Sequence, residues 1–371
     1  MLRTLDVELK QTRMLSNFLR EYNINRLFLS TVGFWPFQSK HLRNSLRIFS
    51  FLLEISYCPF EILLLYDHWD DAQMIFEGCY QNLISMYLIV NQLNEFWNHD
   101  KFRQLYKIID EHWNIFTNDK EIQILKEYST LSRIFTKYYF ISLYIMLLIF
   151  TTIPLTPLLL DIVMPLNESR PRFFALVAEY RVDINEYFLP IFCYTTAVIV
   201  VAMNITLSVN TLMRIVCISH ACSLFVAVRF VDMLDSSQQV VSLVTLLVAT
   251  IGMSLLGMRI LYVKDQLSEL VRSMSIMTGA LVTILIICYS GQKLMDESEN
   301  IFHRTLTTEW YNFSPRLKSL LIITLYRSSV PCGLKVGNMI PLSITTYTTV
   351  SNIPRSYKFI YSFITTLRVC E

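Results

Sequence analysis

Long apolar runs separated by short polar connections dominate the pattern of this chain. Each run approaches or exceeds the roughly 20 residues that a helix needs to cross the hydrocarbon core of a bilayer. The runs lie at about 46–65, 76–97, 138–160, 187–209, 240–261, 274–292 and 336–367. They predict an all-α fold in which seven transmembrane helices form one bundle, in a single domain that covers residues 1–371.

The second and the last run are the least regular. Polar side chains interrupt the second run at Asn82, Asn91, Gln92 and Asn94, and the last run is too long for one straight crossing. Hydroxyl groups recur along the last run, at Ser343, Thr345, Thr346, Thr348, Thr349, Ser362, Thr365 and Thr366. Because a hydroxyl in lipid must find a hydrogen-bond partner, this segment favours a helix that lines a pore or binds its neighbours. An ordinary packed terminal helix is the alternative.

Lysine and arginine residues concentrate in alternate connections. Seven of them precede the first run (Arg3, Lys10, Arg13, Arg20, Arg26, Lys40 and Arg43), whereas residues 66–78 carry none and are acidic. The second connection is again basic, from Lys101 to Lys137. Because bases accumulate on the cytoplasmic side, the pattern predicts a cytoplasmic N-terminal leader at residues 1–45 and an extracellular C-terminus.

Two polar stretches on the predicted inner side have helical spacing. Phe102, Leu105, Ile109, Trp113 and Phe116 form one apolar face, which predicts that the second spanning helix continues into the cytoplasm. Residues 293–335 contain apolar positions between bases but no run long enough to span, and the Ser314-Pro315 pair marks a helix start. Helices one to six at 46–292 are therefore expected to extend into an inner anchor module of cytoplasmic helices, followed by a pore helix at 336–371.

The composition supports a membrane protein and gives no support to catalysis. The chain is 53% hydrophobic and only 17% charged, and its formal charge of +2 is dispersed, which argues against a nucleic-acid partner. Its 8 cysteines and 6 histidines show no metal-ligand spacing, and no nucleophile elbow or phosphate loop is present. We expect no enzyme activity, no cofactor and no metal.

Three blocks of the chain together resemble the insect odorant receptor family. They are PLNESRPRFFALVAEYRVDINEYF from 165, CYSGQKLMDESENIF from 288 with TEWYN from 308, and YRSSVPCGLKVGNMIPLSITTYTTV from 326. The chain departs from the family pattern in a shorter fourth connection and in an inserted SNIPRSYKF near the C-terminus. Both departures bear on whether this chain assembles and gates as its relatives do.

The resemblance implies a ligand-gated, non-selective cation channel in the plasma membrane of an olfactory neuron. In that family a tuning subunit assembles with the shared odorant receptor coreceptor into a hetero-tetramer, and a small volatile ligand binds among the second, third, fourth and sixth helices. The seventh helix of each subunit lines the pore, which places Ser362, Thr365 and Val369 on the pore face. The competing interpretation is that the inserted SNIPRSYKF turns this helix face away from the pore axis.

A pocket for volatile ligands is mostly apolar and aromatic, with few polar groups. In the outer halves of the implied helices, eight residues fit this description: Tyr80, Tyr87, Ile149, Thr152, Tyr194, Val198, Met277 and Leu281. Plain helix packing is the competing interpretation for each of them. Glu54 and Glu61 lie seven residues apart on one helix face, and a structural role is favoured over a functional one.

Asn167 is the glycosylation candidate, because its Asn-Glu-Ser triplet falls in the third connection, on the predicted outer side. Three other classes were weighed against the channel. A G-protein-coupled receptor has the opposite orientation, a gustatory-type receptor channel has a terminal TYxxxxxQF pattern, and a secondary transporter has inverted repeats. None of these features is found in the sequence.

The predicted orientation is testable on intact cells. An epitope tag at Met1 is expected to stay hidden from antibody until the cells are permeabilised, whereas a tag at Glu371 is labelled at the surface. The reverse labelling pattern would contradict both the orientation and the channel assignment.

Overall fold

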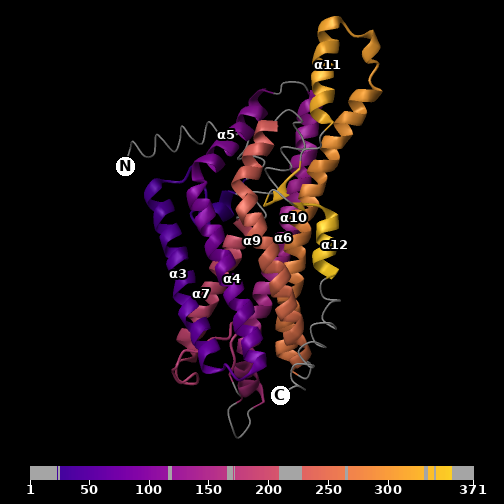
Figure 1. The fold of residues 1–371 in the computed structure, drawn as a ribbon. Coiled ribbons are helices and arrows are strands. Elements are labelled where there is room, and N and C mark those ends of the chain that lie inside the picture. The colour runs from indigo at the N-terminus through magenta and orange to yellow at the C-terminus, as the bar shows by residue number, and fades with distance from the viewer. Residues whose placement is uncertain are drawn as a thin grey trace.

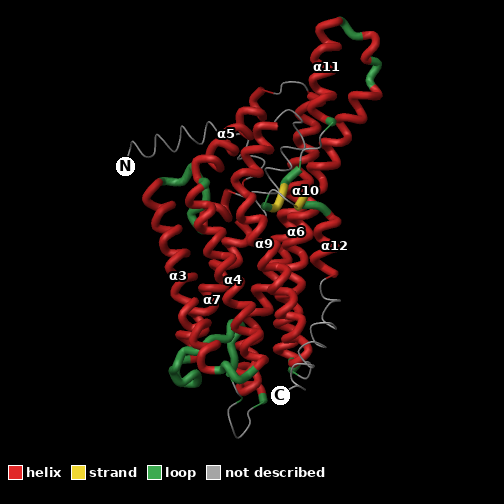
Figure 2. Tube along the Cα trace, viewed as in Figure 1, coloured by secondary structure: helices red, strands yellow, loops and turns green. Residues whose placement is uncertain are grey.

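Helices lie side by side along most of the molecule (Figures 1 and 2). The computed structural model describes residues 23, 26–115, 119–164, 170, 172–208, 228–263, 266–329, 333–337 and 340–352. Its elements are α3 (Lys40–Asp67), α4 (Ala72–Trp97), α5 (His99–Ile115), α6 (Asp119–Val163), α7 (Phe188–Thr206), α9 (Val228–Tyr262), α10 (Leu267–Thr307), η2 (Trp310–Asn312), α11 (Pro315–Ser328), β1 (Lys335–Val336), β2 (Ile340–Pro341) and α12 (Ile344–Asn352).

Among the described residues, five helices are long and apolar enough to cross a membrane. They are α3, Thr136–Val163 of α6, α7, Leu234–Tyr262 of α9, and α10. Each coincides with one of the apolar runs of the sequence, so the helical bundle predicted from those runs is confirmed.

Helix α4 matches the second run but is too polar to count among these five, and its position explains why. It packs against α3, α7 and α9. Seven of its polar side chains are buried: Glu77, Gln81, Ser85, Asn91, Gln92, Asn94 and Glu95. Because these groups contact other helices instead of lipid, a polar helix is tolerated at the centre of an apolar bundle.

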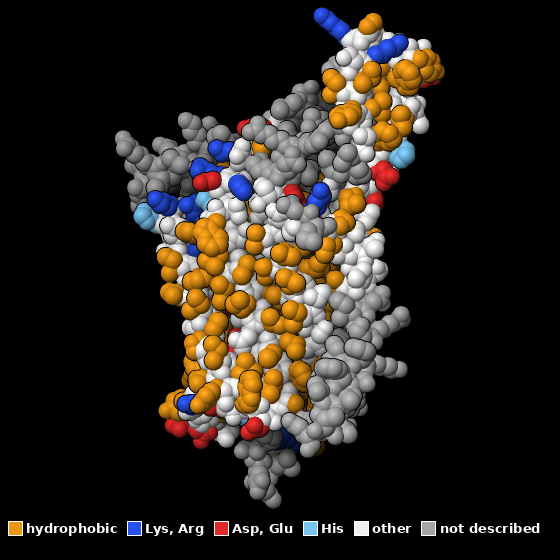
Figure 3. All heavy atoms as spheres, in the orientation of Figure 1, with side chains coloured by type: hydrophobic (Ala, Val, Ile, Leu, Met, Phe, Trp, Pro, Cys, Tyr) orange, Lys and Arg blue, Asp and Glu red, His pale blue; other side chains and the backbone are white. Residues whose placement is uncertain are grey.

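The outer surface carries the complementary pattern. Hydrophobic side chains cover the middle of the visible face, while most visible Lys and Arg lie at the end with α5 and α11 (Figure 3). A group of Asp and Glu occupies the opposite end. Exposed residues such as Phe49, Leu52, Ile62, Leu148 and Leu247 suit contact with lipid chains. The orientation across the bilayer stays a prediction.

The second spanning helix does not simply continue. It ends at Trp97, Asn98 forms its C-cap, and α5 begins at His99. The apolar face predicted for this stretch is buried, since Phe102, Leu105 and Ile109 are 0% exposed. Phe116 lies outside the described residues.

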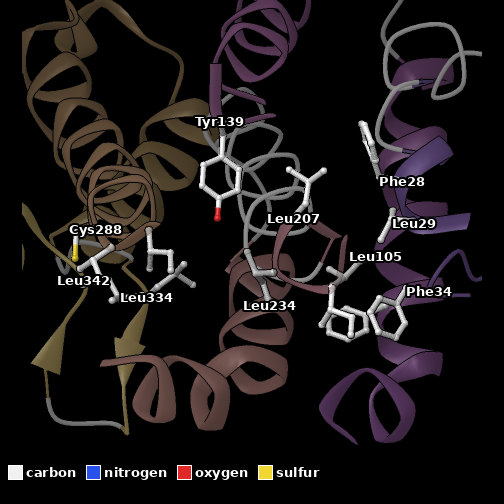
Figure 4. Packing of buried hydrophobic residues seen from close by; sticks show 14 of the residues in the cluster. Phe28, Leu29, Phe34, Leu105, Tyr139, Leu207, Leu234, Cys288, Leu334 and Leu342 are labelled. Carbon is white, nitrogen blue, oxygen red and sulfur yellow. The ribbon is translucent and has the colours of Figure 1, made fainter. Parts of the chain in front are cut away.

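A large hydrophobic cluster joins α5 to the far side of the bundle (Figure 4). Phe28 and Leu105 lie on one side of it, Cys288 and Leu342 on the other, and Leu234 of α9 between them. The cluster therefore ties the segment before α3 and the segment before α12 into one core.

The predicted helices of the inner module start at a different place in the structure. Residues from Lys293 to Thr307 belong to α10, which continues without a break beyond the predicted end of its span. Helix α11 begins at Pro315, as the Ser314-Pro315 pair predicts, because a proline at the first helical position loses no hydrogen bond. It packs on α10 at the end that reaches beyond the bundle (Figure 1).

The prediction that the last helix begins near residue 336 is wrong. Val336 pairs with Ile340 in a two-stranded antiparallel hairpin, and the helix begins only at Ile344. Gly337 has a φ of +55°, which suits glycine, and Pro341 has no N–H to donate. Ser362, Thr365 and Val369 of the predicted pore face lie outside the described residues, as does Asn167.

Gly291 allows the segment before α12 to approach α10 closely. A Cβ atom at this position would overlap the backbone oxygen of Leu342. The contact is reinforced by the N–H of Ile344, which donates to Oε1 of Gln292 at 3.3 Å. The start of α12 is thus held directly on α10.

Four charged side chains hold α4, α9 and α10 together, and three of them, Glu77, Arg259 and Arg272, are buried. The Glu77 carboxylate pairs with Arg259 and with Arg272, the latter at 3.0 Å. Glu269 pairs with the same two guanidinium groups, at 2.5 Å and 2.6 Å. Arg259 and Arg272 are 1% and 0% exposed. Two acids and two bases make this ionic quartet neutral, which is the condition for burying charges at tolerable cost.

Replacing Glu77 with Gln tests this arrangement. The variant leaves two buried guanidinium groups with one carboxylate, so we expect the free energy of unfolding to fall by about 3–5 kcal/mol. Thermal unfolding of the detergent-solubilised protein measures the change. Glu299→Gln on the exposed face of α10 is the matched control. Equal melting temperatures for the two variants would contradict a structural role of the quartet.

Candidate functional site

A cavity of about 240 Å³ lies inside the helical bundle. Its walls come from α3, α4, α6, α7, α9, α10 and the connection before α7. Most of the lining is aliphatic or aromatic, including Phe150, Val198, Met253 and Ile276. An apolar cavity of about 150 Å³ is enough to hold benzene in a protein core. The space therefore suits a small, largely apolar molecule.

Residues of two hydrophobic clusters line the cavity. Leu143 and Ile284 belong to the large cluster around α5. Tyr80, Ile199 and Leu256 belong to a smaller cluster. Ligand binding at this point would touch both parts of the core at once.

Three of the eight residues that the sequence suggests for a pocket line this cavity: Tyr80, Tyr87 and Val198. The other five, Ile149, Thr152, Tyr194, Met277 and Leu281, do not appear among its lining residues. The Thr152 hydroxyl donates to the backbone oxygen of Leu148, and the Tyr194 hydroxyl bonds Ser56 at 2.8 Å. Met277 and Leu281 pack against the two clusters. A ligand-binding role for any of the eight stays a prediction.

Sequence reasoning missed several lining residues. Met146 and Phe150 follow each other by one helical turn on α6 and line the cavity, whereas Ile149 between them does not. Gly252 of α9 lines it too, and a Cβ atom there would meet no atom within 4 Å. An isolated glycine within a spanning run was the available signal, because such residues leave space between helices.

Four polar residues of α3 and α4 enter this apolar lining: Glu54, Glu61, Gln81 and Ser85. The Ser85 hydroxyl donates to Oε1 of Glu61 at 2.9 Å, which joins the two helices. The described part of the chain holds no group of three His, Cys, Asp or Glu that suits a metal ion. The polar groups thus offer hydrogen bonding and charge to a small molecule.

The ionic quartet fixes one wall of the cavity. The Tyr80 hydroxyl donates to Oε1 of Glu77 at 2.7 Å, and Nε2 of Gln81 donates to the same oxygen at 2.5 Å. Both side chains are buried and line the cavity. Their orientation is set by a carboxylate that two arginines hold in place, so this wall is organised before any ligand enters.

The connection before α7 contributes Leu176 to the lining. The backbone oxygen of Ala175 accepts a hydrogen bond from Arg272 at 2.7 Å, so the quartet also anchors this connection. Further along, Arg181 pairs with Asp67 at the end of α3 at 2.7 Å. Burial raises the pKa of Tyr180, which packs on Phe60 of α3 with ring centroids 5.0 Å apart. The connection is thus fastened to the helices that it covers.

Similarity to known proteins agrees with this architecture. Residues 226–353, about a third of the chain, match the family model described as 7tm odorant receptor. Odorant receptor 2a of Drosophila melanogaster is 31% identical over 113 residues, which are 30% of this chain and 27% of the relative. Odorant receptor 67a of the same species is 31% identical over 88 residues, 24% of this chain and 21% of the relative. The matched stretches thus span about a quarter of the curated relatives.

The fold matches solved structures over nearly its whole length. The insect olfactory receptor OR5 from Machilis hrabei superposes with a TM-score of 0.77 at 14% identity, covering 93% of this chain and 98% of that one. Its complex with eugenol superposes with a TM-score of 0.73 at 13% identity, covering 95% and 99%. At such low identity these matches show a common fold alone.

The described helices and their apolar surface define a multi-pass membrane protein with a cavity inside its helical bundle. The family model and the named relatives make the chain similar to insect odorant receptors over residues 226–353 and over the matched stretches, and the shared fold agrees with this similarity.

The open space at Gly252 can be tested by a pair of glycine substitutions. Gly252→Ala is expected to raise the free energy of unfolding by up to about 1 kcal/mol, because alanine favours the helix and its Cβ meets nothing. Gly291→Ala is the matched control, since its Cβ meets the Leu342 backbone, and we expect destabilisation. Thermal unfolding measures both, and destabilisation by Gly252→Ala would show that the space is filled.

Proposed function

We propose that this chain is a tuning subunit of an odorant-gated cation channel that detects volatile chemicals. The observation that carries the proposal is the cavity of about 240 Å³, largely apolar in its lining, within a fold shared with an insect olfactory receptor. One solved structure of that receptor holds eugenol, a small molecule with an aromatic ring. A volatile ligand of similar size fits the apolar walls of this chain.

Helix α10 is the route by which the cavity would act on the C-terminal segment. It lines the cavity at Ile276 and Ile284, and about two turns beyond Ile284 it carries Gly291, where Leu342 is seated. A ligand that fits the cavity better in the open form shifts the population towards that form, by no more than this difference in affinity. A displacement of α10 would then move the start of α12.

The proposed pore is formed by residues that follow Leu342 in the sequence. Ser362, Thr365 and Val369 are proposed to face the pore, and the odorant receptor coreceptor to complete a hetero-tetramer in the plasma membrane of an olfactory neuron. A hydroxyl-lined constriction relies on the partner subunits for an apolar gate. The comparisons do not favour the alternatives, a gustatory-type receptor channel or a G-protein-coupled receptor.

Co-expression in cells that lack odour responses tests the proposal. The chain together with a coreceptor is expected to give an inward cation current in response to a subset of small volatile molecules, recorded by patch clamp. Cells with the coreceptor alone are the control for its own responses. A response that needs no coreceptor and is abolished by blocking G-proteins would contradict the channel assignment, as would silence towards a broad volatile panel.

A further inference from the structure

The cavity contains acceptor oxygens that the fold leaves without hydrogen-bond partners. They are Oε1 of Glu54, Oε2 of Glu61 and Oε1 of Gln81. The three side chains are only 2%, 2% and 3% exposed, so bulk water has little access to them. A buried polar atom without a partner is costly, and because these three border one cavity, a donor group on a ligand could satisfy them.

The described lining of the cavity offers no opposite charge to the two carboxyl groups. Among the described residues that line it, none is Lys, Arg or His. Glu54 and Glu61 lie about 10 Å apart along the axis of α3, because seven residues rise by that amount, so they do not bond each other. A buried carboxyl group is tolerated when it is protonated, or when a cation or several donors face it, and an ammonium group would supply that cation.

Glu77 is a buried acid of the same bundle that has a structural role, and its contacts can be compared with those of Glu54 and Glu61. Its carboxylate pairs with Arg259 and Arg272 and accepts from Tyr80 and Gln81. Among the residues that the structure describes, Glu61 of α3 accepts only from Ser85, and Glu54 lacks even this donor. The fold therefore supplies the charge partner in one place and leaves the cavity acids open to one from outside.

From this arrangement we infer that the cavity selects small amines, whose ammonium group binds at the Glu54 or the Glu61 carboxylate while the apolar body packs against Tyr80, Phe150 and Val198. An ammonium group has three N–H donors and a positive charge, which match acceptor oxygens and carboxylates. The inference deepens the proposed function, on which it rests, by naming the chemical class of the ligand.

Benzylamine and benzyl alcohol are suitable probes, since they share a ring and nearly the same shape but differ in charge. Binding to the full chain, purified in lipid nanodiscs, is measured by titration calorimetry. Benzylamine is expected to bind at least about tenfold more tightly than benzyl alcohol, because a charge-assisted hydrogen bond in a buried site exceeds a neutral one by this margin. Equal affinities, or tighter binding of the alcohol, would overturn the inference without any mutation.

Glu54→Gln and Glu61→Gln keep the shape of each side chain and remove its charge. The variant at the carboxylate that binds the ammonium group is expected to weaken benzylamine binding by about tenfold while leaving benzyl alcohol within a few fold. Glu299→Gln, far from the cavity lining, is the matched control and should change neither ligand. A parallel loss of both ligands in the cavity variants, or no loss of either, would overturn the assignment of the carboxylates.

Failure of this inference is distinguishable from failure of the proposed function. Selective binding of benzylamine without current in cells that also express the coreceptor supports the ligand class and contradicts the channel. Currents evoked by benzyl alcohol and other neutral volatiles, with none evoked by benzylamine, support the channel and overturn the ligand class.

Discussion

The largely buried ionic quartet of Glu77, Glu269, Arg259 and Arg272 is the interaction on which the arrangement of this bundle depends. It joins α4 to α9 and α10, and Arg272 adds the connection before α7 through the backbone oxygen of Ala175. Apolar helices in lipid gain little from the hydrophobic effect when they associate, so polar contacts decide which faces meet. A neutral set of four charges has few alternative pairings, which restricts the ways in which these three helices can pack.

The same quartet explains how a polar helix at the centre and an apolar cavity coexist. Glu77 binds Tyr80 and Gln81 on the next turn of α4, and both then line the cavity with fixed orientation. Helix α4 would be unstable facing lipid, because its buried amides and acids need protein partners. The polar sequence of α4 therefore requires its central position in the bundle, where other helices surround it.

The apolar runs predicted the bundle well, because length and hydropathy respond to the thickness of the bilayer. The start of α11 at Pro315 was also predictable, since proline acts locally. Other features depend on partners distant in sequence: Glu77 and Arg272 are 195 residues apart, and no local pattern pairs them. The same holds for the cavity, where Phe150 lines the space and Ile149 beside it does not. Periodicity defines a helical face but not which neighbour that face meets.

The prediction of where the last helix begins was wrong for a different reason. The apolar run includes Val336 and Ile340, yet Gly337 adopts a positive φ and the chain forms a short hairpin there. This hairpin and the segment after it seat Leu342 on Gly291 of α10. Helix α10 thus carries two members of the quartet, part of the cavity wall and the contact with the segment before α12, all on one continuous helix from Leu267 to Thr307. Because the cavity wall and the seat of Leu342 lie on the same unbroken helix, a shift of α10 along its axis would move both contacts together.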